Sequence, residues 1–205
     1  MIDRDSDAHG IWAERLVVRR QRAAAVFDGL YARSTAAFWG IDLGGQCVFF
    51  GRPILHRAPQ SVIRIGERCV FRSADWSNRI GINRPCTIST IAPGARLSIG
   101  TRSGFSGTVI AAALDIEIGN RVLSGANVTI TDTDWHGQQP DARDQPGASA
   151  PVRICDNVWL GLNVMVLKGV TIGKDSVIAA GSIVTQSIPE GVIAAGNPAK
   201  VIREL

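Results

Sequence analysis

Ile172-Gly-Lys-Asp-Ser-Val177, Ile178-Ala-Ala-Gly-Ser-Ile183 and Val184-Thr-Gln-Ser-Ile-Pro189 are three consecutive six-residue units, each beginning with an aliphatic residue. The register extends upstream, because Ile154 lies 18 residues before Ile172 and Ile118 lies 36 residues before Ile154. Three sixes complete one turn of a triangular coil, and its inward aliphatic residues can be buried only against neighbouring coils. The spacing therefore predicts an all-β parallel β-helix over residues 61–190, in preference to a sandwich of regularly spaced strands.

Composition sets broad limits on this chain. Its 205 residues are 45% hydrophobic, which suits one domain with a substantial core. The formal charge of +4 is mild, and no Lys/Arg run is interleaved with aromatic residues, so we expect no nucleic-acid partner. The four cysteines have no paired short spacing and indicate core thiols. We find no signal peptide and no apolar run of membrane-spanning length, so we expect a cytoplasmic protein without membrane insertion.

Residues 1–60 are predicted to cap the coil. From Ile11 to about Phe38 the apolar spacing suits a helix with a basic face, which Gly40 would end. Laid across the open end of a coiled sheet, such a helix would protect unpaired strand edges. A membrane-surface role is the alternative, and we disfavour it because alanines interrupt the apolar face.

The repeat is interrupted once, after Asp132-Thr-Asp-Trp-His136. Residues 137–150 contain no Ile, Val or Leu, so this segment is expected to leave the coil as a loop, and long loops in compact repeats are usually functional. His136, at its base, is the best candidate for chemistry because imidazole accepts a proton near neutral pH. Asp132 and Asp134 lie close enough in sequence to orient it. His9 and His56 are isolated from it, so we expect no three-histidine zinc site and no other metal.

These motifs support a resemblance that covers residues 61–205. The sixes, the sequence before the polar loop, the restart Asn157-Val-Trp-Leu-Gly161 and the ending up to Arg203 resemble the hexapeptide-repeat acyltransferases. Within that family the likeness is to the galactoside and maltose O-acetyltransferases and to acetyltransferases of polysaccharide biosynthesis. The family implies a left-handed β-helix, a homotrimer, and acetyl-CoA bound between adjacent subunits. Left-handedness comes from the resemblance alone, since crossovers between parallel strands are usually right-handed.

The resemblance also assigns roles to residues. His136 would be the general base that deprotonates an acceptor hydroxyl as its oxygen attacks the thioester. Leu162 departs from the pattern, because some sugar acetyltransferases carry a serine there, and without that hydroxyl a main-chain N–H would have to stabilise the oxyanion. The basic residues of the C-terminal tail, residues 191–205, would reach the coenzyme phosphates. The predicted coenzyme contacts are Trp159, Gly161, Leu162, Ala180, Thr185, Lys200 and Arg203. The predicted acceptor contacts are Asn83, Ser106, Asp115, Asp132, Asp134 and Trp135.

The sequence therefore predicts an acetyl-CoA-dependent O-acetyltransferase that modifies a hydroxyl of a saccharide or a sugar-containing acceptor. One alternative is an N-acetyltransferase of a nucleotide-linked amino sugar, which would use the same histidine. The other is a non-catalytic β-helix that serves as a scaffold subunit. A scaffold would explain the repeats, but it would explain neither the polar loop beside His136 nor the basic tail.

Overall fold

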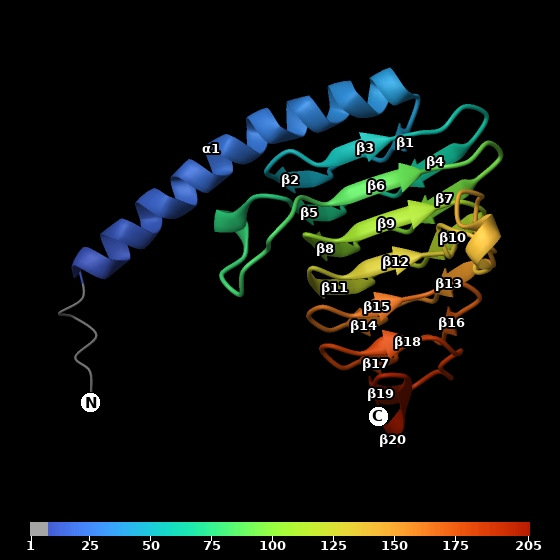
Figure 1. The fold of residues 1–205 in the computed structure, drawn as a ribbon. Coiled ribbons are helices and arrows are strands. Elements are labelled where there is room, and N and C mark those ends of the chain that lie inside the picture. Colours follow the sequence, from blue (N-terminus) through green and yellow to red (C-terminus); the bar gives the residue numbers. More distant parts are fainter. Residues whose placement is uncertain (1–7) are drawn as a thin grey trace.

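The computed structural model describes residues 8–205, which form a three-sided prism of coiled strands with a long helix at one end (Figure 1). Three sheets, here called A, B and C, run along the prism, and the chain visits them in that order in each coil. Sheet A contains β1 (Asp42–Leu43), β4 (Val62–Ile65), β7 (Arg96–Ile99), β10 (Asp115–Ile118), β13 (Val152–Ile154) and β16 (Thr171–Ile172). Sheet B contains β2 (Val48–Phe50), β5 (Val70–Arg72), β8 (Gly104–Ser106), β11 (Leu123–Ala126), β14 (Trp159–Leu160), β17 (Val177–Ile178), β19 (Val192–Gly196) and β20 (Ala199–Glu204). Sheet C contains β3 (Ile54–His56), β6 (Thr87–Thr90), β9 (Val109–Ala112), β12 (Thr129–Thr131), β15 (Met165–Val166) and β18 (Ile183–Val184).

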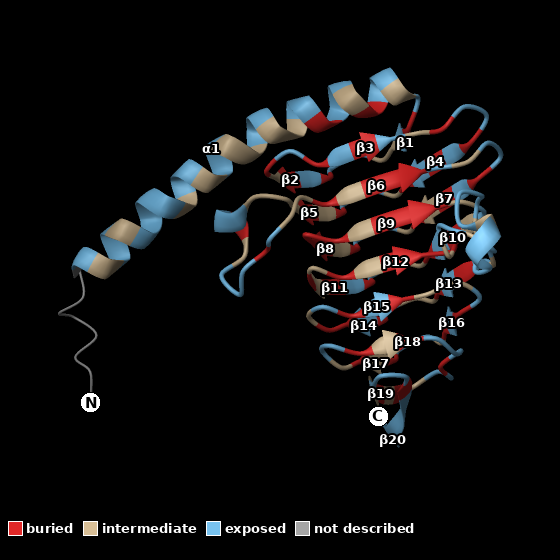
Figure 2. Ribbon diagram, viewed as in Figure 1, coloured by how far each residue is buried: buried red, intermediate tan, exposed pale blue. Residues whose placement is uncertain are grey.

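The aliphatic columns lie where the sixes predict. In sheet A, parallel pairing aligns Ile65 with Ile99, Ile99 with Ile118, Ile118 with Ile154 and Ile154 with Ile172. All five side chains are at most 3% exposed. Inward positions are buried along the whole prism (Figure 2). These parallel pairings and the burial of the inward residues confirm the prediction of a parallel β-helix. The six-residue repeat determines which side chains stack on one another.

The part of the core nearest α1 contains a column of aromatic side chains in β2, β5 and β8. The rings of Phe49, Phe71 and Phe105 stack in successive strands of sheet B, with centroids 5.1 and 5.4 Å apart and interplanar angles of 10° and 12°. Each of the three side chains is at most 2% exposed. Offset stacking of this kind adds to the free energy gained from burial alone.

The coil begins earlier than we expected. β1, β2 and β3 pair with the next coil in the same three sheets, so residues 42–56 already form a complete turn ahead of the expected boundary at residue 61. An excursion between β5 and β6 then carries a short 3-10 helix, η1 (Asp75–Ser77). This excursion lengthens the spacing between equivalent residues, which hid the first coils from a search for sixes.

Helix α1 (Ala8–Trp39) confirms the predicted helix, and Gly40 follows it with a φ of +63°. Only its second half lies on the coil: Ala32 and Ala36 are buried, and the carboxylate of Asp28 accepts a hydrogen bond of 2.7 Å from the N–H of Gly51. The first half extends beyond the coil (Figure 1). The expected capping role therefore applies to part of the helix.

The opposite end of the prism is closed by a hairpin. β19 and β20 pair antiparallel at the end of sheet B, so the segment expected to be a tail is an ordered strand.

A second short 3-10 helix, η2 (Pro140–Ala142), lies in the polar loop. None of the helices described between residues 8 and 205 is long and apolar enough to cross a membrane.

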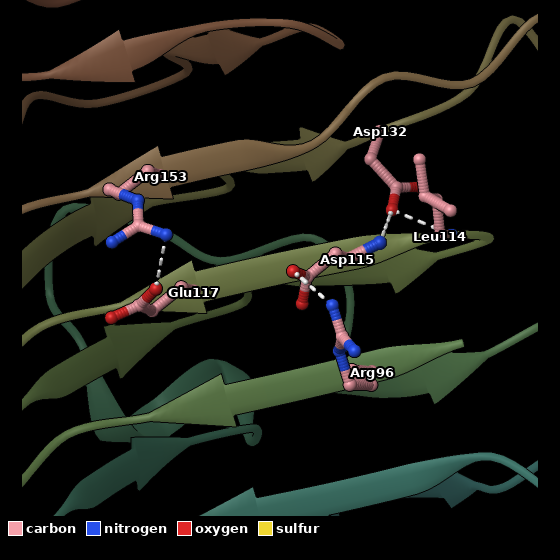
Figure 3. A network of polar contacts seen from close by, with 6 residues as sticks. All are labelled: Arg96, Leu114, Asp115, Glu117, Asp132 and Arg153. Carbon is pink, nitrogen blue, oxygen red and sulfur yellow. Dashed lines mark hydrogen bonds and ion pairs between the residues drawn. The ribbon is translucent and has the colours of Figure 1, made fainter. Parts of the chain in front are cut away.

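The outer faces of the sheets differ in chemistry. Sheet A carries ion pairs on its outer face, with Arg96 and Asp115 3.0 Å apart and Arg153 and Glu117 2.9 Å apart (Figure 3). The outward positions of sheets B and C are instead often apolar and exposed, including Ile54 at 52%, Leu123 at 54%, Trp159 at 51% and Met165 at 38%. Ion pairs thus gather on the outer face of sheet A, whereas large apolar side chains are exposed on sheets B and C.

Replacing Phe71 by Ala is expected to lower the free energy of unfolding by about 3–5 kcal/mol, because it leaves a cavity between two stacked rings. The matched control is Phe27→Ala, which removes a side chain that is 71% exposed. Urea unfolding of both variants measures the difference. Equal stability of the two variants would contradict the aromatic column as a source of stability.

Candidate active site

The polar loop leaves the prism on a short two-stranded stem. It emerges after β12 and returns before β13, and Thr133 forms an antiparallel bridge with Ser149. The N–H of Asp134 donates to the carbonyl of Ala148 at 3.0 Å, which extends the stem. The excursion therefore begins before residue 137, the start expected from composition. His136 lies beyond the stem and not at its base.

Asp132 does not orient the histidine. Its carboxylate is fully buried and accepts three main-chain hydrogen bonds, from Ala113 at 2.7 Å, Leu114 at 2.8 Å and Asp115 at 2.7 Å. Figure 3 shows the bonds to Leu114, in the turn that joins β9 to β10, and to Asp115, the first residue of β10. The expected contact with His136 was wrong, because the buried carboxylate is needed by three otherwise unpaired N–H groups.

Asp134 anchors the loop to the next coil. Its Oδ1 lies 2.5 Å from Nζ of Lys168, and its Oδ2 accepts a hydrogen bond of 2.9 Å from Gln138. The hydrogen bond from Lys168 holds the pKa of Asp134 below its usual value of 3.8. The carboxylate of Asp134 does not bond to the imidazole of His136, so the second expected orienting contact was wrong; the two residues are joined through the main chain, where His136 N–H donates to Asp134 O at 2.8 Å. Lys168 stands 36 residues after Asp132, the offset that also pairs Thr129 with Met165 in adjacent coils, because the polar loop adds 18 residues to the period. This register would have revealed Lys168 as a neighbour of this corner.

His136 is held by a main-chain oxygen. Its Nδ1 lies 2.8 Å from the carbonyl oxygen of Arg143, within a loop closed by a bond of 3.0 Å from Gly137 N–H to Gln145 O. A carbonyl oxygen only accepts hydrogen bonds, so Nδ1 carries the proton and Nε2 presents a lone pair. The imidazole is exposed, and so is the neighbouring Trp135, whose φ is +67°. The geometry therefore provides an accessible base, with Arg143 as an orienting residue that the sequence did not indicate.

Three predicted coenzyme residues lie at another edge, where sheet B passes into sheet C. Gly161 and Leu162 follow β14, and Ala180 follows β17. A Cβ on Gly161 would lie 2.6 Å from the nitrogen of Ala180, so this corner requires glycine. The carbonyl of Leu162 accepts a bond of 2.7 Å from Gly181, whereas the amides of Leu162 and Ala180 have no acceptor within residues 8–205.

The other predicted coenzyme contacts are more widely spread. Trp159 projects from the outer face of sheet B, and Thr185 follows β18 at the edge where sheet C passes into sheet A. Lys200 and Arg203 are exposed on β20. One chain therefore does not bring these side chains together around a single groove.

The predicted acceptor contacts are also divided. Asn83 and Ser106 lie near the B–C edge, where Asn127 bonds to both: its Oδ1 accepts from Asn83 N–H at 3.1 Å, and its N–H donates to Ser106 O at 2.9 Å. Asp115 belongs to the C–A edge, beside Asp132, but its carboxylate pairs with Arg96. His136 and Ala180 thus lie on opposite sides of sheet C.

Across the described range, from residue 8 onward, no group of three or more His, Cys, Asp or Glu side chains is positioned to hold a metal ion. The four cysteines are free thiols, and Cys47, Cys69 and Cys86 are buried in the core.

Comparison with known proteins identifies the fold. Residues 151–186 match the family described as "Hexapeptide repeat of succinyl-transferase". The structure of a mutant of AntD, an N-acyltransferase from Bacillus cereus in complex with dTDP-4-amino-4,6-dideoxyglucose and coenzyme A, has a TM-score of 0.53 at 14% identity, over 85% of this chain and 89% of that chain. The fold is thus the left-handed parallel β-helix, and residues 151–186 carry the hexapeptide repeat of the matched family.

Its homologues include galactoside O-acetyltransferases. That of Lactococcus lactis subsp. lactis (strain IL1403) is 40% identical over 142 residues, which are 69% of this chain and 62% of the relative. That of Escherichia coli (strain K12) is 46% identical over 90 residues, 44% of each protein. The chain thus matches less than two thirds of the length of either relative.

The Asp134–Lys168 pair is expected to make stability depend on pH. Because the pKa of Asp134 is lowered in the folded state, the stabilisation is complete above about pH 4 and is lost as the pH falls through that lowered pKa. Lys168→Met should therefore lower the melting temperature at neutral pH and have a smaller effect in acid. Thermal unfolding of both proteins across this range checks the prediction, and a pH-independent difference would contradict it.

Proposed function

We propose that this protein is an acetyl-CoA-dependent O-acetyltransferase that modifies a hydroxyl of a saccharide or of a sugar-containing acceptor. The observation that carries the proposal is the exposed imidazole of His136, whose Nδ1 is held by the Arg143 carbonyl so that Nε2 is free to accept a proton. The names of the two galactoside O-acetyltransferases support this class of reaction and of acceptor. Coenzyme A in the AntD structure is consistent with the donor.

The proposed chemistry is a direct displacement. Nε2 of His136 takes the proton of the acceptor hydroxyl as that oxygen attacks the thioester carbonyl. The tetrahedral intermediate then collapses with cleavage of the carbon–sulfur bond, and the imidazolium returns the proton to the coenzyme thiolate. No covalent enzyme intermediate is required, and three of the cysteines are buried.

The oxyanion requires a donor other than a side-chain hydroxyl, because Leu162 has none. The amides of Leu162 and Ala180 are candidates, since neither donates to an acceptor within the described residues. Fixed main-chain donors can stabilise a developing oxyanion, and losing one such donor typically lowers kcat by about 10²–10³-fold.

The proposed assembly is a homotrimer with active sites between subunits. His136 and the corner of Leu162 and Ala180 lie on different edges of one prism, so a second copy is needed to bring these groups to one groove. The apolar side chains exposed on sheets B and C, such as Leu123 and Met165, supply surface for that contact. Trp159 and Thr185 would then line the groove, with Lys200 and Arg203 near the coenzyme phosphates.

Replacing His136 by Ala is expected to lower kcat by about 10²–10⁴-fold, the usual contribution of a general base, without weakening coenzyme binding. The matched control is His9→Ala, which changes a histidine on α1 far from the loop. Thiol release from acetyl-CoA gives the rate, and calorimetry with coenzyme A gives the affinity. Unchanged turnover in the His136 variant would refute the assignment.

The acceptor class is expected to emerge from the same assay with galactosides, maltose, nucleotide sugars and amino sugars. An alkali-labile product would be an ester and would support O-acetylation, whereas an alkali-stable amide would favour the N-acetyltransferase alternative. A protein that binds no coenzyme A and releases no thiol with any acceptor would favour the scaffold alternative.

Sedimentation equilibrium is expected to give three times the mass of the chain, and Leu123→Glu should shift the protein toward monomer because a buried charge in an apolar interface is costly. The matched control is Glu117→Gln, on the charged outer face of sheet A. A mass of one chain for the unmodified protein would contradict the proposed assembly.

A further inference from the structure

The outward side of α1 carries large apolar side chains that are exposed. Five of them form what is here called the apolar stripe, with exposed fractions of 43–80%: Trp12, Leu16, Phe27, Leu30 and Phe38. Leu30 and Phe38 each lie two residues from the buried Ala32 and Ala36, a separation of about 200° around a helix. The stripe therefore faces away from the prism end on which the helix rests.

A helix that only capped the coil would turn its large apolar side chains toward the coil, but in α1 these side chains face outward. Small residues pack on the coil, because Ala32 and Ala36 let the helix approach the strands closely, while the side chains with the most apolar area remain in water. Large exposed apolar side chains gathered on one side of a helix mark an interaction site, although the exposed Arg20 interrupts this side between Leu16 and Phe27. The stripe runs from Trp12 to Phe38, about 40 Å along one helix.

Arginines accompany the stripe. Arg15, Arg19, Arg22 and Arg33, here called the basic row, are exposed on the adjoining side of α1. The helix has only two carboxylates, and both are already engaged: Glu14 lies 2.9 Å from Arg79, and Asp28 accepts from the N–H of Gly51 at 2.7 Å. The basic row thus has no acidic partner on its own helix.

We propose that α1 docks in the plane of an anionic membrane surface, with the apolar stripe among the acyl chains and the basic row at the lipid phosphates. Helices that lie at such interfaces combine Trp, Phe and Leu on one side with arginine or lysine on the other. The sequence disfavoured this role because alanines interrupt the apolar spacing, but the structure places Ala32 and Ala36 against the coil and leaves the large apolar side chains exposed on the opposite side. Surface docking of this kind needs no segment that crosses the bilayer.

A second copy of the chain is a poorer occupant for the same face. Two such helices packed stripe to stripe would bring two basic rows together, with no free carboxylate on either helix to compensate. A phosphate-rich surface supplies the missing negative charge. Asp3, Asp5 and Asp7 precede the helix and oppose this attraction, so the apolar stripe must supply most of the binding free energy.

The experiment is flotation of the full chain with vesicles of phosphatidylcholine alone or mixed equally with phosphatidylglycerol. We expect binding to the mixed vesicles that weakens with salt. The double variant Phe27→Ser and Leu30→Ser should lower the partition coefficient at least ~10-fold, since both side chains lose their apolar area. Arg15→Gln should lower it about fivefold on anionic vesicles only.

The matched control is the double variant Val201→Ser and Ile202→Ser, which removes two exposed apolar side chains from β20 at the other end of the prism and should float like the unmodified protein (Figure 1). Unchanged melting temperatures would show that the variants fold. The proposal is overturned if the full chain binds neither vesicle, or if the stripe variant and the control bind equally. It is also overturned if the stripe instead governs the mass of the protein in vesicle-free solution.

Discussion

The stacking of inward side chains between coils is the constraint on which the whole structure depends. A single turn of eighteen residues has no interior of its own, so each aliphatic or aromatic column gains its burial from the turns above and below. The isoleucine column from Ile65 to Ile172 and the phenylalanine column of sheet B are two forms of this arrangement. Both ends of such a stack need covering, and here α1 covers one end and β20 lies at the other.

The fold could be predicted from the sequence only where the chain keeps the eighteen-residue period of the coil. From Ile118 to Thr185 the sixes predict every strand, because the same spacing places the same side chain inward in each turn. The first coil was missed because Phe49 and Phe71 are 22 residues apart and not 18, and because the excursion widens the next interval, from Phe71 to Phe105, to 34 residues. The helix was found from its apolar spacing, but spacing alone does not show which side packs. The side that packs on the coil is the one with the small residues Ala32 and Ala36, because they let the helix approach the strands closely.

The candidate site shows a similar limit. His136 stood out because a polar loop interrupts an aliphatic pattern, yet both carboxylates near it in sequence proved to have other partners. Asp132 satisfies the turn at Ala113, and Asp134 pairs with Lys168. These contacts join different coils, so they depend on the offset between turns and not on nearness along the chain. The contact of His136 with the carbonyl of Arg143 could not be predicted from the sequence, because any residue at position 143 would provide a main-chain carbonyl.

The stem of the polar loop has a consequence for how such proteins diversify. The chain departs and returns at adjacent positions, and the pairing of Ile116 with Val152 is the pairing that an uninterrupted coil would have. A different loop could therefore be grafted onto the same stem without changing any stacking contact below it. Selection could thus replace the segment that presents His136 as a cassette, while the scaffold that determines folding stays constant.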